Sequence, residues 1–346
     1  MKMTLDLSQI RAITCGAELV EQRTEGIWFQ RMTDEQLEVY REPNPAFYAK
    51  ALATSGVMLS FITDSPFIDL DISIVKVMNR AYGTVEVFCN DKALENINNY
   101  SQMKLPRNYA ELSFPNIRKK VTYDLGAGEK KIKILFPRTA GVYLHELTLA
   151  DGATLTPVKP VKKLLVYGDS ITQGFDCLRP SSHYVYRLAE ALDAEEFNKG
   201  IGGERHAPAL VECDESFTPD YILVAFGTND WRRTDPEFLE CNCAALYRIL
   251  GEKYPNVPVI TVTPVWRADL NAYGDAIRFQ SFHDVEACIL RHTAAYPNVT
   301  VIRGFDLIPH DIKHFADYGL HPNDSGFTHY SKNLLAALKE KGFPIA

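Results

Sequence analysis

The sequence has no long apolar run and no excess of positive charge. None of its 346 residues lies in a segment approaching the ~20 apolar residues of a membrane span. Lys and Arg number 37 against 44 Asp and Glu, so the formal net charge is −7. This mild acidity favours solubility and gives no support to binding of nucleic acid or an anionic membrane. We expect neither partner.

Paired cysteines and a leader segment are also missing. The seven cysteines are an odd number without paired spacing, which is typical of free thiols in a reducing compartment. Cys241 and Cys243 fit two neighbouring thiols better than a redox pair. The segment Met1–Ser8 has no long apolar core and no small-residue cleavage site, so we expect no signal peptide. Together these features predict a cytoplasmic protein.

No internal repeat or low-complexity segment divides the chain, but its length favours two domains. Hydrophobic residues make up 46%, enough for sizeable cores, and 23% charged residues argue against disorder. Thr156–Pro160 reads as a short linker, because its prolines favour an extended connector. We predict domains at residues 1–157 and 161–346.

The first domain lacks any convincing amphipathic helix of ten or more residues. Short runs rich in β-branched and aromatic residues recur instead between turn signals, which predicts an all-β sandwich or jelly roll. The clearest runs are Gly26–Gln30, Val57–Ile62, Thr84–Cys89 and Lys131–Phe136.

In the second domain, strand-like runs alternate with helix-like stretches. This alternation predicts an α/β domain, a parallel sheet with helices on both faces, in which ligands bind beyond the carboxyl ends of the strands. The strand-like runs are Leu164–Tyr167, Ala194–Asn198, Tyr221–Phe226, Val259–Val262 and Val299–Ile302, and the helix-like stretches are Ser182–Leu192, Pro236–Lys253, Asp275–Tyr296 and Gly326–Lys341.

Candidate catalytic residues follow several of these strands. Ser170, in Gly168-Asp169-Ser170, stands on a turn after the first strand, where its hydroxyl and N–H would face the sheet's carboxyl edge. Gly203 lies in the loop after the second strand, where a glycine lets the backbone N–H approach a substrate oxygen. Asn229 follows the third strand, and its amide can donate to an oxyanion. Taken singly, each also fits an ordinary turn or helix-capping residue.

His321 is the candidate general base, since a neutral imidazole can take a proton from a serine hydroxyl. Asp317 could orient it as the third member of a triad. The alternatives are an inert surface histidine and a metal site that His321 shares with His310 and His314. Its spacing matches no common zinc pattern, so we predict no metal.

These residues lie in four short sequence blocks: Gly168–Ser170, Asn198–Gly203, Gly227–Asp230 and Gly319–Asp324. Together the four blocks resemble the SGNH hydrolases, the GDSL-type esterases and acylhydrolases, over residues 161–346. The resemblance implies a flavodoxin-like three-layer α/β/α domain with Ser170 as nucleophile and His321 as base. It implies an oxyanion hole formed by the N–H groups of Ser170 and Gly203 and the side chain of Asn229. No metal or organic cofactor is required.

One position departs from the family pattern. The family usually has its acidic residue three positions before the histidine, which here is Tyr318, whereas Asp317 lies four before. Either Asp317 reaches the imidazole Nδ1 and completes a triad, or a backbone carbonyl orients the imidazole and leaves a Ser–His dyad.

A β-sandwich ahead of such a domain resembles two-domain carbohydrate esterases, which implies a short-acyl, acetyl-type ester of a small molecule or oligosaccharide as substrate. Trp231 and Trp266 follow strands and could stack on sugar rings, though packing is an equal alternative. Asp169 is a further candidate for substrate contact. The rival functions are a lipid or thioester acylhydrolase and a carbohydrate-binding protein with a decayed site. The sandwich could also serve to form a homo-oligomer.

Overall fold

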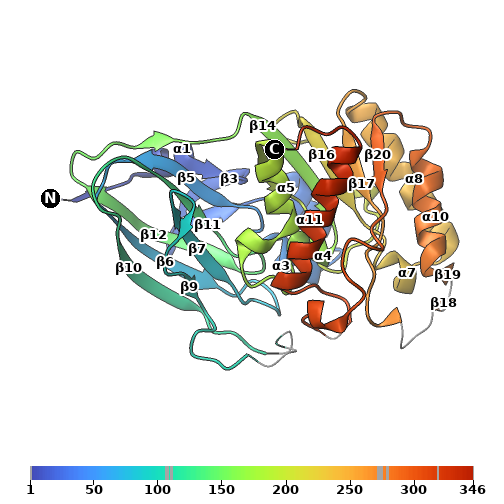
Figure 1. Cartoon of the computed structure of the whole chain (residues 1–346), viewed down its shortest axis with the longest axis horizontal. Coiled ribbons are helices and arrows are strands. Elements are labelled where there is room, and N and C mark those ends of the chain that lie inside the picture. Colours follow the sequence, from blue (N-terminus) through green and yellow to red (C-terminus); the bar gives the residue numbers. More distant parts are fainter. Residues whose placement is uncertain are drawn as a thin grey trace.

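A β-sandwich and an α/β domain lie side by side in this computed structural model (Figure 1). The structure describes residues 2–105, 109, 112–270, 276–277, 280–317 and 319–345. The N-terminus lies at the outer end of the sandwich, and the sandwich ends at residue 157, just before the first strand of the second domain. Among the described residues, no helix has both the length and the apolar character of a membrane span.

Two antiparallel sheets form the sandwich, as the strand pattern predicts. Their inner faces share one apolar core that includes Phe29, Phe61, Leu70 and Ile134. One sheet has the order β10 (Ile117–Asp124), β6 (Phe67–Val75), β12 (Gly141–Ala150), β4 (Gly26–Gln30) and β3 (Leu19–Arg23), with β1 (Lys2–Thr4) beside β12; the other has the order β13 (Thr156–Pro157), β5 (Met58–Thr63), β11 (Lys130–Leu135), β7 (Thr84–Cys89) and β8 (Lys92–Ala93), with β2 (Thr14–Cys15) beside β5 and β9 (Ile97–Asn98) beside β7.

The second domain is a three-layer α/β/α fold, as predicted. Its five strands are parallel and have the flavodoxin-like order β15 (Ala194–Asn198), β14 (Lys162–Gly168), β16 (Tyr221–Ala225), β17 (Val259–Val262) and β20 (Val299–Ile302). One face is covered by α5 (Tyr184–Leu192) and α11 (Asp324–Glu340), and the other by α6 (Pro208–Glu212), α8 (Pro236–Lys253) and α10 (Phe282–Thr293). Shorter elements are α4 (Ser170–Gln173), η2 (Pro180–Ser182), α7 (Asp230–Arg233), η3 (Ile312–His314) and the strands β18 (Ala276–Ile277) and β19 (Gln280–Ser281).

The predicted helix over Asp275–Tyr296 begins too early. Asp275 itself lies outside the described residues, and α10 begins only at Phe282, where the Ser281 side chain accepts the backbone N–H of Asp284 in a capping box. The strand β19 ends directly before this cap. The hydrogen bonds of this cap set the start of α10 at Phe282. The spacing of apolar residues does not show the cap, so the predicted helix begins several residues too early.

Three short helices of the N-terminal region were not predicted: α1 (Leu7–Ile13), α2 (Asp34–Arg41) and α3 (Pro45–Ala51). They are too short to give a clear apolar period. Leu37 and Tyr40 of α2 and Ala51 of α3 pack into the same core as α8 and α10 of the second domain. The N-terminal region and the second domain therefore share one hydrophobic core.

Candidate active site

Ser170 stands at the carboxyl end of β14, inside the parallel sheet, and begins α4. Asp169 caps this helix, because its Oδ1 accepts the N–H of Ile171 at 2.9 Å. The turn is tight: a Cβ at Gly168 would meet Thr172 Oγ1 at 2.3 Å and the Ala225 carbonyl oxygen at 2.7 Å. Only glycine therefore fits at position 168, two residues before the serine.

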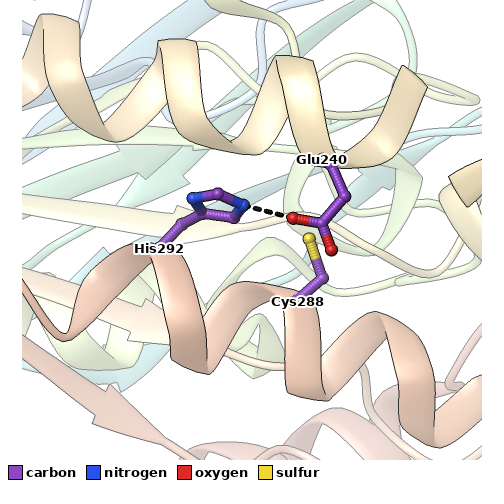
Figure 2. Close-up of side chains that lie close together, drawn as sticks. All are labelled: Glu240, Cys288 and His292. Carbon is purple, nitrogen blue, oxygen red and sulfur yellow. Dashed lines mark hydrogen bonds and ion pairs between the residues drawn. The ribbon is translucent and has the colours of Figure 1, made fainter. Parts of the chain in front are cut away.

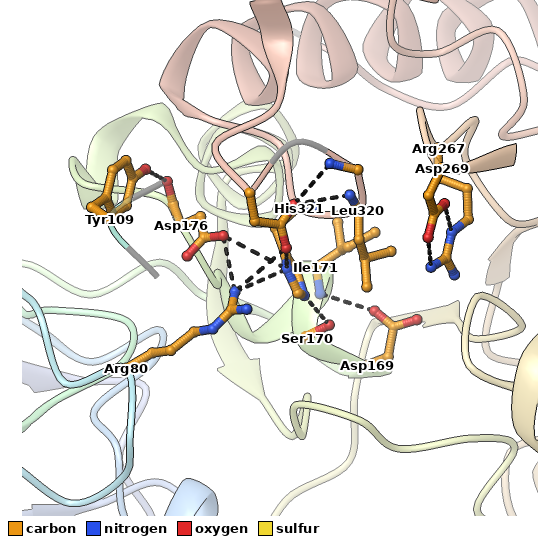
Figure 3. Close-up of polar contacts among 12 residues, drawn as sticks. Arg80, Tyr109, Asp169, Ser170, Ile171, Asp176, Arg267, Asp269, Leu320 and His321 are labelled. Carbon is orange, nitrogen blue, oxygen red and sulfur yellow. Dashed lines mark hydrogen bonds and ion pairs between the residues drawn. The ribbon is translucent and has the colours of Figure 1, made fainter. Parts of the chain in front are cut away.

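The structure brings Ser170, His321 and Asp317 together, and Figure 3 shows His321 beside Ser170. His321 Nε2 lies 2.7 Å from Ser170 Oγ, and His321 Nδ1 lies 2.5 Å from Asp317 Oδ2. All three side chains are largely buried, with 6% of the His321 side chain and 11% of the Asp317 side chain exposed. This is the geometry in which an imidazole relays a serine proton.

Asp317 reaches the imidazole although it lies one position earlier than the family pattern. Its other oxygen, Oδ1, accepts the backbone N–H groups of Gly319 (3.3 Å), Leu320 (2.9 Å) and His321 (2.9 Å), so the loop wraps around the carboxylate. Burial opposes ionisation, but the His321 charge and these hydrogen bonds outweigh it and hold the pKa of Asp317 well below its usual range. Tyr318, at the family's acid position, lies outside the described residues.

Gly203 and Asn229 lie on adjoining loops at the same sheet edge. Gly203 has φ +91°, a left-handed conformation that favours glycine. Asn229 precedes α7 without capping it; its Nδ2 donates instead to the Glu204 carbonyl at 2.9 Å. The Asn229 side chain therefore ties the loop that carries Gly203, and the capping alternative does not describe it.

The Gly203 loop is held from the sandwich as well. The guanidinium of Arg31, which has no exposed surface, donates to the carbonyls of Asn198 (2.5 Å) and Gly200 (2.9 Å). Gln173 Oε1 accepts the Gly202 N–H at 2.7 Å. These bonds fix the loop backbone from two sides.

Two site residues carried no signal in the sequence pattern: Arg80 and Asp176. Arg80 lies in the sandwich loop between β6 and β7, and its Nη1 lies 2.9 Å from Asp176 Oδ2, 3.0 Å from His321 Nδ1 and 3.7 Å from Asp317 Oδ2. Asp176 follows α4, and its Oδ2 lies 3.6 Å from His321 Nδ1. Arg80 and His321 are 241 residues apart, so no local motif could have joined them.

Asp176 is fully buried and held by tyrosines of the sandwich. Tyr82 Oη donates to its carboxylate, and Tyr109 Oη donates to its backbone carbonyl at 2.5 Å. Burial raises the pKa of Asp176, and the charges of His321 and Arg80 act against that rise. Its backbone has φ +64°, a region that Asp and Asn enter more readily than most residues.

The structure does not place Asp169 as a substrate contact. Only 3% of the residue is exposed, and its side chain turns inward to cap α4. Burial raises its pKa to about 6. Asp169 is therefore a support of the Ser170 turn, and the prediction of substrate contact is corrected.

The two tryptophans proposed for sugar stacking are buried packing residues. Trp231 is 0% exposed and meets Phe282 edge to face, with the Arg267 guanidinium 4.9 Å from its ring. Trp266 is 6% exposed and stacks on His310. Neither ring presents a face to a substrate, so the packing alternative describes both.

Two groups of described residues combine side chains of the kinds that bind metals. The first is Asp176, Asp317 and His321, between which the Arg80 guanidinium already supplies a positive charge. His310 and His314 belong to neither group; His314 Nδ1 lies instead 2.9 Å from Ser325 Oγ.

The second group lies between α8 and α10 and consists of Glu240, Cys288 and His292 (Figure 2). Glu240 Oε2 lies 2.5 Å from His292 Nε2, and its other oxygen pairs with Arg291. The carboxylate is therefore engaged in an ion-pair network that links the two helices.

Comparison with known proteins agrees with this fold. Residues 166–328 match the model of the GDSL-like lipase/acylhydrolase family. No curated protein matches the chain.

Three solved structures match along nearly the whole chain. A salicylyl-acyltransferase, SsfX3, from a tetracycline biosynthetic pathway is 18% identical over 96% of both chains, with a TM-score of 0.77. A family two carbohydrate esterase from Cellvibrio japonicus is 16% identical over 98% of both (TM-score 0.66), and an acetyl xylan esterase from Butyrivibrio proteoclasticus is 16% identical over 100% of both (TM-score 0.59). At these identities the likeness concerns the two-domain fold.

Proposed function

Since its C-terminal domain is a GDSL-like acylhydrolase domain and the chain is thus a carboxylic ester hydrolase, we propose that it removes short acyl groups, in particular acetyl, from carbohydrates. The catalytic part of this proposal rests on one observation: His321 is hydrogen-bonded to both Ser170 and Asp317 at the carboxyl edge of the sheet.

In the proposed mechanism, Ser170 Oγ attacks the ester carbonyl while His321 Nε2 takes its proton. The tetrahedral oxyanion accepts hydrogen bonds from the N–H groups of Ser170 and Gly203 and from the Asn229 amide. His321 returns the proton to the departing alcohol, and water then hydrolyses the acyl-enzyme with His321 again as base. Each oxyanion donor contributes roughly 3–4 kcal/mol to the barrier reduction in well-studied cases.

In this mechanism Asp317 selects the tautomer of His321 that can accept the serine proton. With Nδ1–H donating to Asp317, the lone pair of Nε2 faces the serine hydroxyl. The carboxylate also stabilises the imidazolium that forms during attack. This supports a triad over a Ser–His dyad.

The carbohydrate part of the proposal draws its support from the fold neighbours that are described as carbohydrate or acetyl xylan esterases. With the tryptophans buried, sugar recognition falls to other side chains. The rival substrates are lipid esters and thioesters, which the same catalytic residues can attack; the rival class is a binding protein without turnover.

The test offers the purified enzyme acetylated xylo-oligosaccharides, a short phospholipid and an acetyl thioester, and follows acetate or acid release by NMR. Serine-dependent turnover of the sugar ester at a kcat/KM at least tenfold above the others supports the proposal. Preference for the lipid or thioester would transfer the activity to that class, and no turnover of any ester in the presence of tight sugar binding would favour the binding protein.

We keep the cytoplasm as the proposed compartment. All seven cysteines are free thiols in the structure, and five of them are buried. Free thiols are stable where the medium is reducing. Fractionation of the source cells tests this point.

A further inference from the structure

We propose that Arg80 of the β-sandwich and Asp176 are positioning residues for the reaction: as an ion pair against His321 Nδ1, they set the basicity of the imidazole and leave Asp317 as its only acceptor. The inference rests on the proposed function, in which His321 is the general base. It assigns the N-terminal domain a part in proton transfer.

Three charged groups surround the same ring nitrogen. Around His321 Nδ1 lie Asp317 Oδ2 at 2.5 Å, Arg80 Nη1 at 3.0 Å and Asp176 Oδ2 at 3.6 Å. Nδ1 has room for one hydrogen bond, so the three groups compete for it. The outcome decides whether Nε2 can accept the serine proton.

Arg80 alone would favour the unproductive tautomer. If Nδ1 accepted from Arg80, the ring proton would sit on Nε2, which could then only donate to Ser170 Oγ. The shorter contact to Asp317 favours Nδ1–H instead. Arg80 then donates to Asp176 Oδ2 at 2.9 Å, which occupies the second carboxylate and removes it as a rival acceptor.

The charges balance around the imidazole. The two carboxylates of Asp317 and Asp176 contribute a charge of −2 and Arg80 a charge of +1. The net charge beside the imidazole is −1, as in a triad with a single carboxylate. Without Arg80 two carboxylates would hold a proton on His321; without Asp176 the guanidinium would oppose the imidazolium. The described titratable or charged groups facing His321 from each element are Asp317, Asp176, Arg80 and, behind Ser170, Asp169, with Tyr82 behind Asp176.

Both domains contribute contacts that hold this pair. Three quarters of the Arg80 side chain is covered, and its guanidinium lies 5.5 Å from the ring of Phe175, which itself lies 5.4 Å from the His321 ring. Tyr82 and Tyr109 hold Asp176 from the other side. Arg80 therefore reaches the imidazole only when the two domains are docked.

Opposite charge changes should move the pH dependence in opposite directions. Arg80→Gln removes a positive charge, so the imidazole holds its proton to higher pH and the acid limb of kcat/KM moves up by about 1 pH unit. Asp176→Asn, which suits the positive φ, removes a negative charge and moves the limb down by a similar amount. The double variant restores the −1 balance and returns the limb close to that of the parent enzyme.

The experiment measures each variant twice. The first readout is the pH profile of kcat/KM for p-nitrophenyl acetate. The second is the NMR titration of the His321 ring protons without substrate, assigned by their loss in His321→Gln. Arg118→Gln is the matched control, because Arg118 makes a two-fold 2.8 Å pair with Asp71 elsewhere on the sandwich and should leave both readouts unmoved.

Opposite shifts that cancel in the double variant support the proposal. Unmoved midpoints, or shifts in the same direction, overturn it, because a merely structural role would lower kcat without moving the limb in opposite senses. If Arg80→Gln does not fold, Arg80→Lys keeps the charge and must stay near the parent midpoint while Asp176→Asn moves down. Shifted NMR midpoints with no esterase activity would leave the positioning role standing and reject the proposed function.

Discussion

The two sides of Ser170 are built by different means. On the His321 side, Asp317, Asp176 and Arg80 place three formal charges around one ring nitrogen. On the Gly203 side, the loop is held by hydrogen bonds to backbone groups, from Arg31, Gln173 and Asn229. The difference teaches that charges face the imidazole on the first side, whereas hydrogen bonds hold a loop backbone in place on the second.

Both sides depend on the β-sandwich, which contributes one arginine to each. Arg80 meets the acid–base side and Arg31 the oxyanion side. Changes on the first side should alter the pH dependence of turnover, and changes on the second should alter its rate or the stability of the fold. The first three predictions below test this division.

Among the changes that test this division, the largest effect is expected for Asp317→Asn. The amide oxygen can keep the three backbone N–H bonds, so its NH2 group would face His321 Nδ1 and force the proton onto Nε2. We expect kcat for p-nitrophenyl acetate to fall by about 10⁴. Asp311→Asn, an exposed helix cap on the same segment, is the control and should leave kcat unchanged. Near-normal turnover of Asp317→Asn would establish the dyad.

A smaller loss is expected for Asn229→Ala on the oxyanion side. One neutral donor disappears, so kcat should fall by about 10²–10³. Because no charge changes, both limbs of the pH profile should keep their midpoints. A displaced limb would contradict the division between the side that sets the pH dependence and the side that sets the rate.

Arg31→Met tests how the sandwich holds the Gly203 loop. The change leaves the buried carbonyls of Asn198, Gly200 and Ala53 without their donor, which should lower the free energy of unfolding by about 3 kcal/mol. Urea unfolding measures it. An unchanged midpoint of unfolding would mean that other groups hold the loop.

The smallest effect is a gain in stability from Asp169→Asn. The folded pKa of about 6 exceeds the unfolded value near 3.9, so the folded state binds the proton more tightly and stability falls as the pH rises from about 4 to 6. Asn keeps the capping oxygen without the charge. We expect a gain of about 1–3 kcal/mol at pH 8 and almost none at pH 4, from urea unfolding at both values. An equal effect at both pH values would contradict the raised pKa.

The sequence predicts which residues lie at the carboxyl edge of the parallel sheet, and the reason is physical. Apolar runs mark buried parallel strands, and the residues that follow them lie at one edge of the sheet, as Ser170, Gly203 and Asn229 do. The sequence allows two outcomes for Asp317, a triad or a dyad, because a carboxylate that accepts three backbone N–H groups depends on the loop conformation.

What could not be predicted lies in contacts between distant segments. Arg80 reaches His321 only through the docking of two domains, and α2 and α3 are short helices that gain stability by packing on the second domain. The tryptophan hypothesis was wrong because position after a strand does not tell whether a ring faces solvent or core: Trp231 has no exposed surface.

The most direct measurement is hydrolysis of p-nitrophenyl acetate by the protein and by Ser170→Ala, with mass spectrometry of the quenched protein for an acetylated peptide. The account predicts rapid turnover, an acetyl group on the peptide that contains Ser170, and a loss of about 10⁶ in kcat in the variant. Turnover that survives in Ser170→Ala, or acetyl found only on another residue, would contradict it.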